Sequence, residues 1–158
     1  MLDYQNRKYW FTLSLLSAAG MAVTGYLIYQ HFKPAGGSFC NVSDYVSCDI
    51  VNKSKYSEIF GIPVAILGFA TYTLLFLLIQ SVIKQWNLER ISKFLHFRNL
   101  LSFLAFFSGF SLVFSLYLTT VEFFLLRAVC IMCLTQQIII LFIFIIFLAL
   151  WLKHRKSS

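Results

Sequence analysis

Four runs of apolar residues dominate the pattern of this chain, and short polar segments separate them. The runs cover about residues 9–32, 61–82, 99–121 and 130–152. A helix needs about 20 apolar residues to cross a bilayer core that is about 30 Å thick. The pattern therefore predicts four membrane-spanning helices, and with them an all-α integral membrane protein whose residues 1–158 form one helical-bundle domain.

The longest polar segment, residues 33–58, joins the first two runs and contains Cys40 and Cys48. Pro34, Gly36 and Gly37 mark the end of the first helix. We expect a cysteine-bearing loop here, with room for a short extra helix near residues 50–60. The connector at residues 84–98 is basic and has apolar residues at helical spacing, so we expect it to lie along the membrane surface.

Composition supports a membrane protein: 59% of the residues are hydrophobic and 12% are charged. Soluble domains have about 45–50% apolar and about 25% charged residues. The net charge of +7 would suggest a nucleic-acid partner for a soluble protein. In a membrane protein it reports orientation instead, because Lys and Arg gather on the cytoplasmic side.

An even number of spans brings both termini to one side of the membrane. Nine basic residues fall on that side: Arg7, Lys8, Lys84, Arg90, Lys93, Arg98, Lys153, Arg155 and Lys156. Four fall on the other: Lys33, Lys53, Lys55 and Arg127. This asymmetry predicts cytoplasmic termini and puts all four cysteines at the outer face. The compartments beyond that face permit disulfides.

The cysteines fall into a loop pair, Cys40 and Cys48, and a helix pair, Cys130 and Cys133, at the start of the fourth run. Static disulfides are one explanation, but a loop of about nine residues gains only about 2.5 kcal/mol from closure. A zinc site is another, but the loop pair is too widely spaced for it. A redox role fits better, because a helix N-terminus favours a thiolate and a second pair can exchange with it. Electrons that reach a pair inside the membrane need an acceptor there, and a lipid-soluble quinone is suitable.

The order of these residues resembles the vitamin K epoxide reductase family. The resemblance covers about residues 39–134 and the four-span layout, and it rests on these segments: Cys40, Cys48-Asp49, Ser54-Lys55-Tyr56-Ser57, Phe60-Gly61-Ile62-Pro63 and Cys130-Ile131-Met132-Cys133-Leu134. It implies that Cys40 receives electrons from a thioredoxin-like (DsbA-like) partner, that Cys48 passes them to Cys130, and that Cys133 reduces the quinone.

For the quinone site we expect contacts from Cys133 and from Ser54, Phe60, Glu122 and Gln137. Ser54 matches the loop serine of the family, and Glu122 is a candidate proton relay. The alternatives are a turn residue for Ser54, ordinary packing for Phe60 and an interfacial charge for Glu122. Val64 and Gln137 stand where vertebrate epoxide-reducing members carry Asn and Tyr, which favours simple quinone reduction, as in bacterial members.

The sequence thus predicts a membrane thiol–quinone oxidoreductase that supports disulfide-bond formation. The electron acceptor is a quinone of the ubiquinone, menaquinone or vitamin K type. The chain ends at Ser158 without a fused thioredoxin-like domain, so we expect a separate partner, and we expect the protein in a bacterial plasma membrane. Two alternatives stay open: a vitamin K quinone or epoxide reductase of an endoplasmic-reticulum membrane, and a non-catalytic bundle with structural disulfides.

Overall fold

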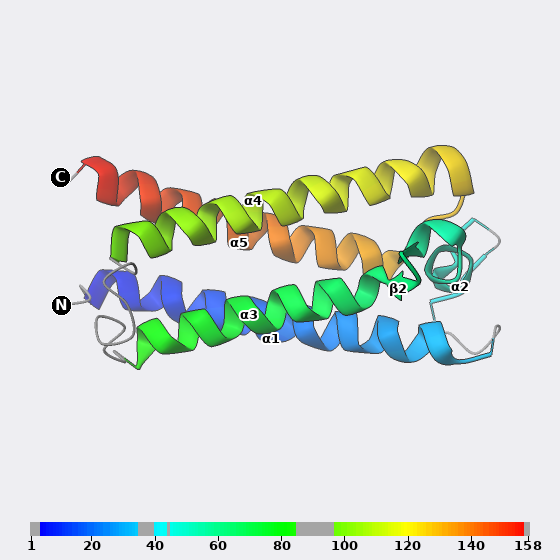
Figure 1. The fold of residues 1–158 in the computed structure, drawn as a ribbon, viewed down its shortest axis with the longest axis horizontal. Helices are drawn as coiled ribbons and strands as arrows, with labels where there is room; N and C mark the ends of the chain where they lie inside the picture. Colours follow the sequence, from blue (N-terminus) through cyan, green and yellow to red (C-terminus); the bar gives the residue numbers. More distant parts are fainter. Residues whose placement is uncertain (1–3, 35–39, 44, 85–96, 157–158) are drawn as a thin grey trace.

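Four long helices run alongside one another in the computed structural model, which describes residues 4–34, 40–43, 45–84 and 97–156 (Figure 1). The four helices, in chain order, are α1 (Tyr4–Phe32), α3 (Val64–Ile83), α4 (Phe97–Val121) and α5 (Ile131–Lys156). All four are long and apolar enough to cross a membrane. The prediction of an all-α, multi-pass membrane bundle is confirmed.

The loop between the first two spans has more local structure than the sequence predicts. The expected short helix is present as α2 (Cys48–Asn52), and a 3-10 turn, η1 (Lys55–Ser57), follows it. Strands β1 (Glu58–Ile59) and β2 (Ile62–Pro63) then pair antiparallel as a small hairpin. The second span consequently begins at Val64 and not at residue 61, because the residues before it belong to this hairpin.

The hairpin turns at Phe60 and Gly61, and both have positive φ angles, of 53° and 78°. A two-residue turn with positive φ at both positions matches the right-handed twist of the flanking strands. Glycine adopts this conformation without strain, whereas Phe60 adopts it at a steric cost. The expected surface helix at residues 84–98 lies mostly outside the described residues, which omit 85–96.

Helix α1 packs against α3 and α5, and α4 packs against α5. The approach of α1 to α3 is close, since a Cβ atom added to Gly20 would lie 2.4 Å from the Tyr72 ring. The main core lies around Trp10, Leu75 and Phe147, each at most 2% exposed. These contacts fix the helices that carry the cysteines.

Both termini lie at one end of the bundle, and α2 and the hairpin lie at the other (Figure 1). A second, smaller buried cluster at the latter end includes Cys40, Cys48 and Cys130, with Cys133 packed against it. The fold therefore gathers cysteines from two distant parts of the sequence at one end of the membrane bundle.

Candidate redox site

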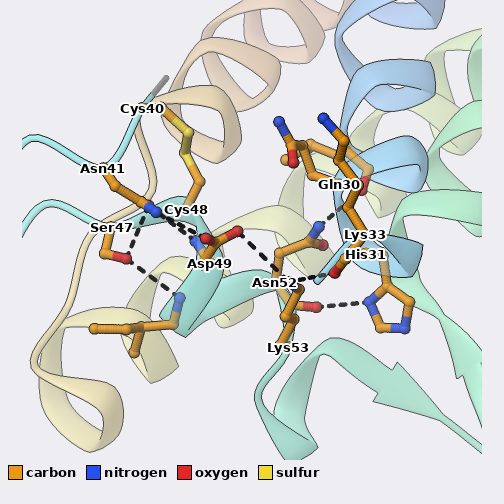
Figure 2. A network of polar contacts seen from close by, with 12 residues as sticks. Gln30, His31, Lys33, Cys40, Asn41, Ser47, Cys48, Asp49, Asn52 and Lys53 are labelled. Atoms are coloured by element: carbon orange, nitrogen blue, oxygen red, sulfur yellow. Dashed lines mark hydrogen bonds and ion pairs between the residues drawn. A yellow bond between two sulfur atoms is a disulfide. The ribbon is translucent and has the colours of Figure 1, made fainter. Parts of the chain in front are cut away.

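The loop pair is joined: Cys40 and Cys48 form a disulfide with a Cα–Cα distance of 5.8 Å. Beside it, Asn41 donates from Nδ2 to Asp49 Oδ2 at 2.7 Å and accepts from Ser47 Oγ at 3.0 Å (Figure 2). Ser47 is the N-cap of α2. Polar contacts from the residue after Cys40 thus hold this segment against α2 in addition to the disulfide.

Helix α2 is tied to the end of α1 by a second set of polar contacts (Figure 2). Asn52 donates from Nδ2 to the backbone oxygen of Leu27 at 2.7 Å, and this bond is buried. His31 Nδ1 lies 2.7 Å from the backbone oxygen of Asn52, and its Nε2 lies 3.4 Å from Glu58 Oε1. The loop that carries Cys48 is therefore anchored to a membrane-spanning helix.

The helix pair lies directly against the loop pair. Cys130 is fully buried immediately before α5, and its Sγ lies 3.2 Å from Cys48 Sγ. The backbone N–H of Cys133 donates to Cys130 Sγ at 3.3 Å. Cys130 and Cys133 are free cysteines. A thiol so close to one sulfur of a disulfide can exchange with it by attack of sulfur on sulfur.

Backbone hydrogen bonds set the register between the two cysteine pairs. Val129 donates to the carbonyl oxygen of Tyr45 at 2.8 Å, and Ser47 donates to that of Val129 at 3.1 Å. Val129 precedes Cys130, and Ser47 precedes Cys48. These hydrogen bonds hold the backbone at Val129 against the backbone at Tyr45 and Ser47, next to the sulfur atoms.

Glu122 is a buried carboxyl group beside the helix pair, with 3% of its surface exposed. It opens a π-helical turn, η3 (Glu122–Leu126), which ends at Arg127 in the left-handed region. Its Oε2 accepts from the backbone N–H of Cys130 at 3.1 Å, and Glu122 lines the same cavity as Cys133. A carboxyl group so close to the helix pair is a candidate proton acceptor for its thiols.

Cys133 lines a cavity of about 60 Å³ at this end of the bundle, together with Ser54, Asn52 and Glu122. A second, larger cavity of about 240 Å³ lies between α3 and α4 and is mostly apolar. Its walls include Phe107, Phe110 and Phe114. The two cavities share four wall residues: Val64, Ser115, Leu118 and Gln136.

The sequence-predicted residues separate into two groups in space. Ser54 and Glu122 line the first cavity with Cys133, and Ser54 Oγ donates to the backbone oxygen of Val51 at 2.8 Å. Phe60 is fully exposed at the tip of the hairpin. Gln137 Oε1 accepts a hydrogen bond from Thr119 Oγ1 at 2.5 Å. Neither Phe60 nor Gln137 is among the residues that line the two cavities.

Sequence reasoning missed most residues of the cavity walls, and among them are the two amide side chains Asn52 and Gln136. The sequence could have identified Gln136, because a residue three positions after Cys133 lies on the same helical face. Asn52 gave no signal, since its place depends on a hydrogen bond to α1, far away in the sequence.

Comparison with known proteins identifies the family of this chain. No curated protein was found to match the sequence. The model of the vitamin K epoxide reductase family matches residues 11–148, which include all four spans in large part and all four cysteines. The chain therefore belongs to the vitamin K epoxide reductase family, and it shares that family's general activity as a quinone-reducing thiol oxidoreductase.

Proposed function

We propose that this protein oxidises a separate thioredoxin-like partner at its outer face and delivers the electrons to a membrane quinone, in support of disulfide-bond formation. One observation carries the proposal: Cys130 Sγ lies 3.2 Å from Cys48 Sγ of the Cys40–Cys48 disulfide, while Cys133 of the same helix pair lines a cavity. The two pairs thus form a continuous path for thiol–disulfide exchange from the loop into the membrane.

The first exchange takes place at the loop pair. A partner thiolate attacks Cys40, the bond to Cys48 breaks, and Cys48 leaves as a thiolate. The second thiol of the partner then attacks the mixed disulfide, so the partner leaves oxidised and both loop cysteines are reduced. Because Cys40 is only 2% exposed, its segment must move away from α2 for the partner to reach it.

The second exchange moves the electrons inward. Cys48 attacks Cys130 of a Cys130–Cys133 disulfide and releases Cys133 as a thiolate. Cys40 then attacks Cys48, which re-forms the loop disulfide and releases Cys130. The products are an oxidised loop pair and a reduced helix pair, which is the arrangement of the four sulfurs in this structure.

The cavities suit the electron acceptor. A quinone supplies the electron sink when bound, since it takes up two electrons and two protons and leaves as the quinol. Cys133 and Ser54 line the smaller cavity, which suits the ring, and the apolar cavity between α3 and α4 suits a hydrocarbon chain. The helix pair gives up two electrons and two protons as its disulfide re-forms, and Glu122 takes the proton of Cys133.

The residues of the cavity walls and the distribution of basic residues bear on the substrate and on the orientation in the membrane. Val64 is an apolar wall residue of both cavities, which supports plain quinone reduction over epoxide reduction. The basic residues predominate on the side of the termini, which supports cytoplasmic termini with the cysteines outward. The membrane that we propose is a bacterial plasma membrane.

The test uses the purified protein in lipid nanodiscs with a reduced thioredoxin-like oxidase and decylubiquinone. We expect one quinol for each disulfide formed in the partner, and no turnover of vitamin K epoxide. Cys133→Ala should abolish quinol formation while the protein stays folded, as judged by its helical circular dichroism. Persistent quinol formation by this variant would overturn the proposal, and so would a folded wild-type protein that forms none.

A further inference from the structure

We propose that Gln136 is a quinone-binding residue, and that its side-chain amide donates a hydrogen bond to the quinone carbonyl farther from Cys133. The inference rests on the proposed function, because it assumes that a quinone is the ligand of the cavities. It assigns a specificity-determining contact to a residue outside the cysteine relay.

The position of Gln136 is the first argument. It lies three residues after Cys133 on α5, so the two side chains share one face of the helix at about 5–6 Å between Cβ atoms. It also lines both cavities. Gln136 therefore stands one turn deeper than the reactive thiol, where the small cavity meets the apolar one.

The free hydrogen-bonding capacity of its amide is the second argument. Within the described residues, the Gln136 side chain has no hydrogen-bond partner, although its backbone oxygen accepts from Tyr72 Oη at 2.9 Å. A glutamine amide offers two N–H donors and a carbonyl acceptor. Gln136 is partly exposed and lines both cavities, so these groups are accessible to a ligand there. A ligand with a carbonyl oxygen would satisfy the donor.

The fold leaves space for this amide on the facing helix. A Cβ atom added to Gly68 of α3 would lie 3.3 Å from Gln136 Nε2 and 3.1 Å from Thr24 Cγ2. Both distances are tighter than most side-chain contacts. The bare glycine backbone thus lets the amide lie between α3 and α5 without being displaced.

The neighbouring glutamine differs from Gln136 in its position. Gln137 Oε1 is occupied by Thr119 Oγ1 at 2.5 Å, and its side chain is not part of either cavity wall. A 1,4-quinone has carbonyl oxygens at opposite ends of its ring. With one end near Cys133, Ser54 and Glu122, the other end points towards Gln136 and the apolar cavity. This arrangement selects ligands that have a hydrogen-bond acceptor at both ends.

The experiment measures decylubiquinone binding by calorimetry, with the full-length protein in nanodiscs, so that the readout is independent of turnover. We expect Gln136→Leu, which keeps the side-chain size, to raise the Kd by about 3- to 10-fold, the effect of losing one neutral hydrogen bond. Gln136→Glu should weaken binding at least as much, because an ionised carboxylate cannot donate. Infrared difference spectra should show one quinone carbonyl band that is lowered in frequency in the wild type and restored in Gln136→Leu.

Two further variants make the result decisive. Thr135→Val alters the adjacent residue, whose hydroxyl donates to the Ile131 oxygen within α5 at 2.9 Å, and should leave Kd and carbonyl bands unchanged. Gln137→Leu tests the alternative assignment. Unchanged Kd and carbonyl bands in Gln136→Leu would overturn the inference, and so would a shift in Gln137→Leu alone. If wild-type protein binds the quinone but forms no quinol from a dithiol, the proposed function fails by itself; absence of binding overturns both.

Discussion

Glu122 shows how one residue connects the fold to the proposed chemistry. The fold buries its carboxyl group, yet the carboxyl accepts the backbone N–H of Cys130 and lines the same cavity as Cys133. A positioned acid–base group of this kind contributes about 10²- to 10⁴-fold to a proton-transfer step. Because the side chain lies beside the helix pair, its replacement should affect the oxidation of that pair more than the exchange at the loop.

We therefore predict that Glu122→Gln slows quinol formation by about 10-fold or more, a smaller effect than the full contribution of a positioned acid–base group because water can partly substitute. The amide keeps an oxygen that can accept from Cys130 N–H, so the local structure should persist. The measurement is single-turnover quinol formation from the prereduced protein. Exchange between Cys48 and Cys130, followed by acid quenching and thiol alkylation, is the control and should change little. Equal slowing of both steps would show that Glu122 acts on the structure alone.

At the scale of elements, the length of each apolar run determined which helices could be predicted from the sequence. The four spans follow from runs of about 20 apolar residues, and their predicted ends agree with the helix ends in the structure to within five residues. The hairpin was missed because strands of two residues carry no detectable alternation. The sequence alone does not distinguish Gln136 from Gln137, whereas the structure has Gln136 in the cavity walls, because one step along a helix turns a side chain by about 100°.

The attachment of α2 to α1 gives a second prediction. Asn52→Ala removes a buried side-chain hydrogen bond to the Leu27 oxygen and the buried side chain that makes it, which should cost about 1–3 kcal/mol of stability. Asn41→Ala removes contacts of an exposed side chain and should cost about 1 kcal/mol or less. Reversible unfolding in a mixed-detergent titration, with the loop disulfide intact, measures both. Equal losses for the two variants would mean that burial does not set the strength of this attachment.

At the scale of the whole molecule, the even number of spans makes the orientation testable at two exposed sites. Phe60 is fully exposed at the end that holds the cysteines, and Lys153 is exposed near the C-terminus at the other end. We predict that Phe60→Cys, in a protein whose native cysteines are replaced by serine, reacts with a membrane-impermeant maleimide added outside intact spheroplasts. Lys153→Cys should react only after the membrane is opened, because nine of the 13 basic residues belong to that end, and such an excess favours the cytoplasmic side. The reverse labelling pattern would put the loop pair in the reducing cytoplasm, where a partner could not be kept oxidised for disulfide formation. The proposed function therefore requires this orientation, whereas the helix packing would be the same in either orientation.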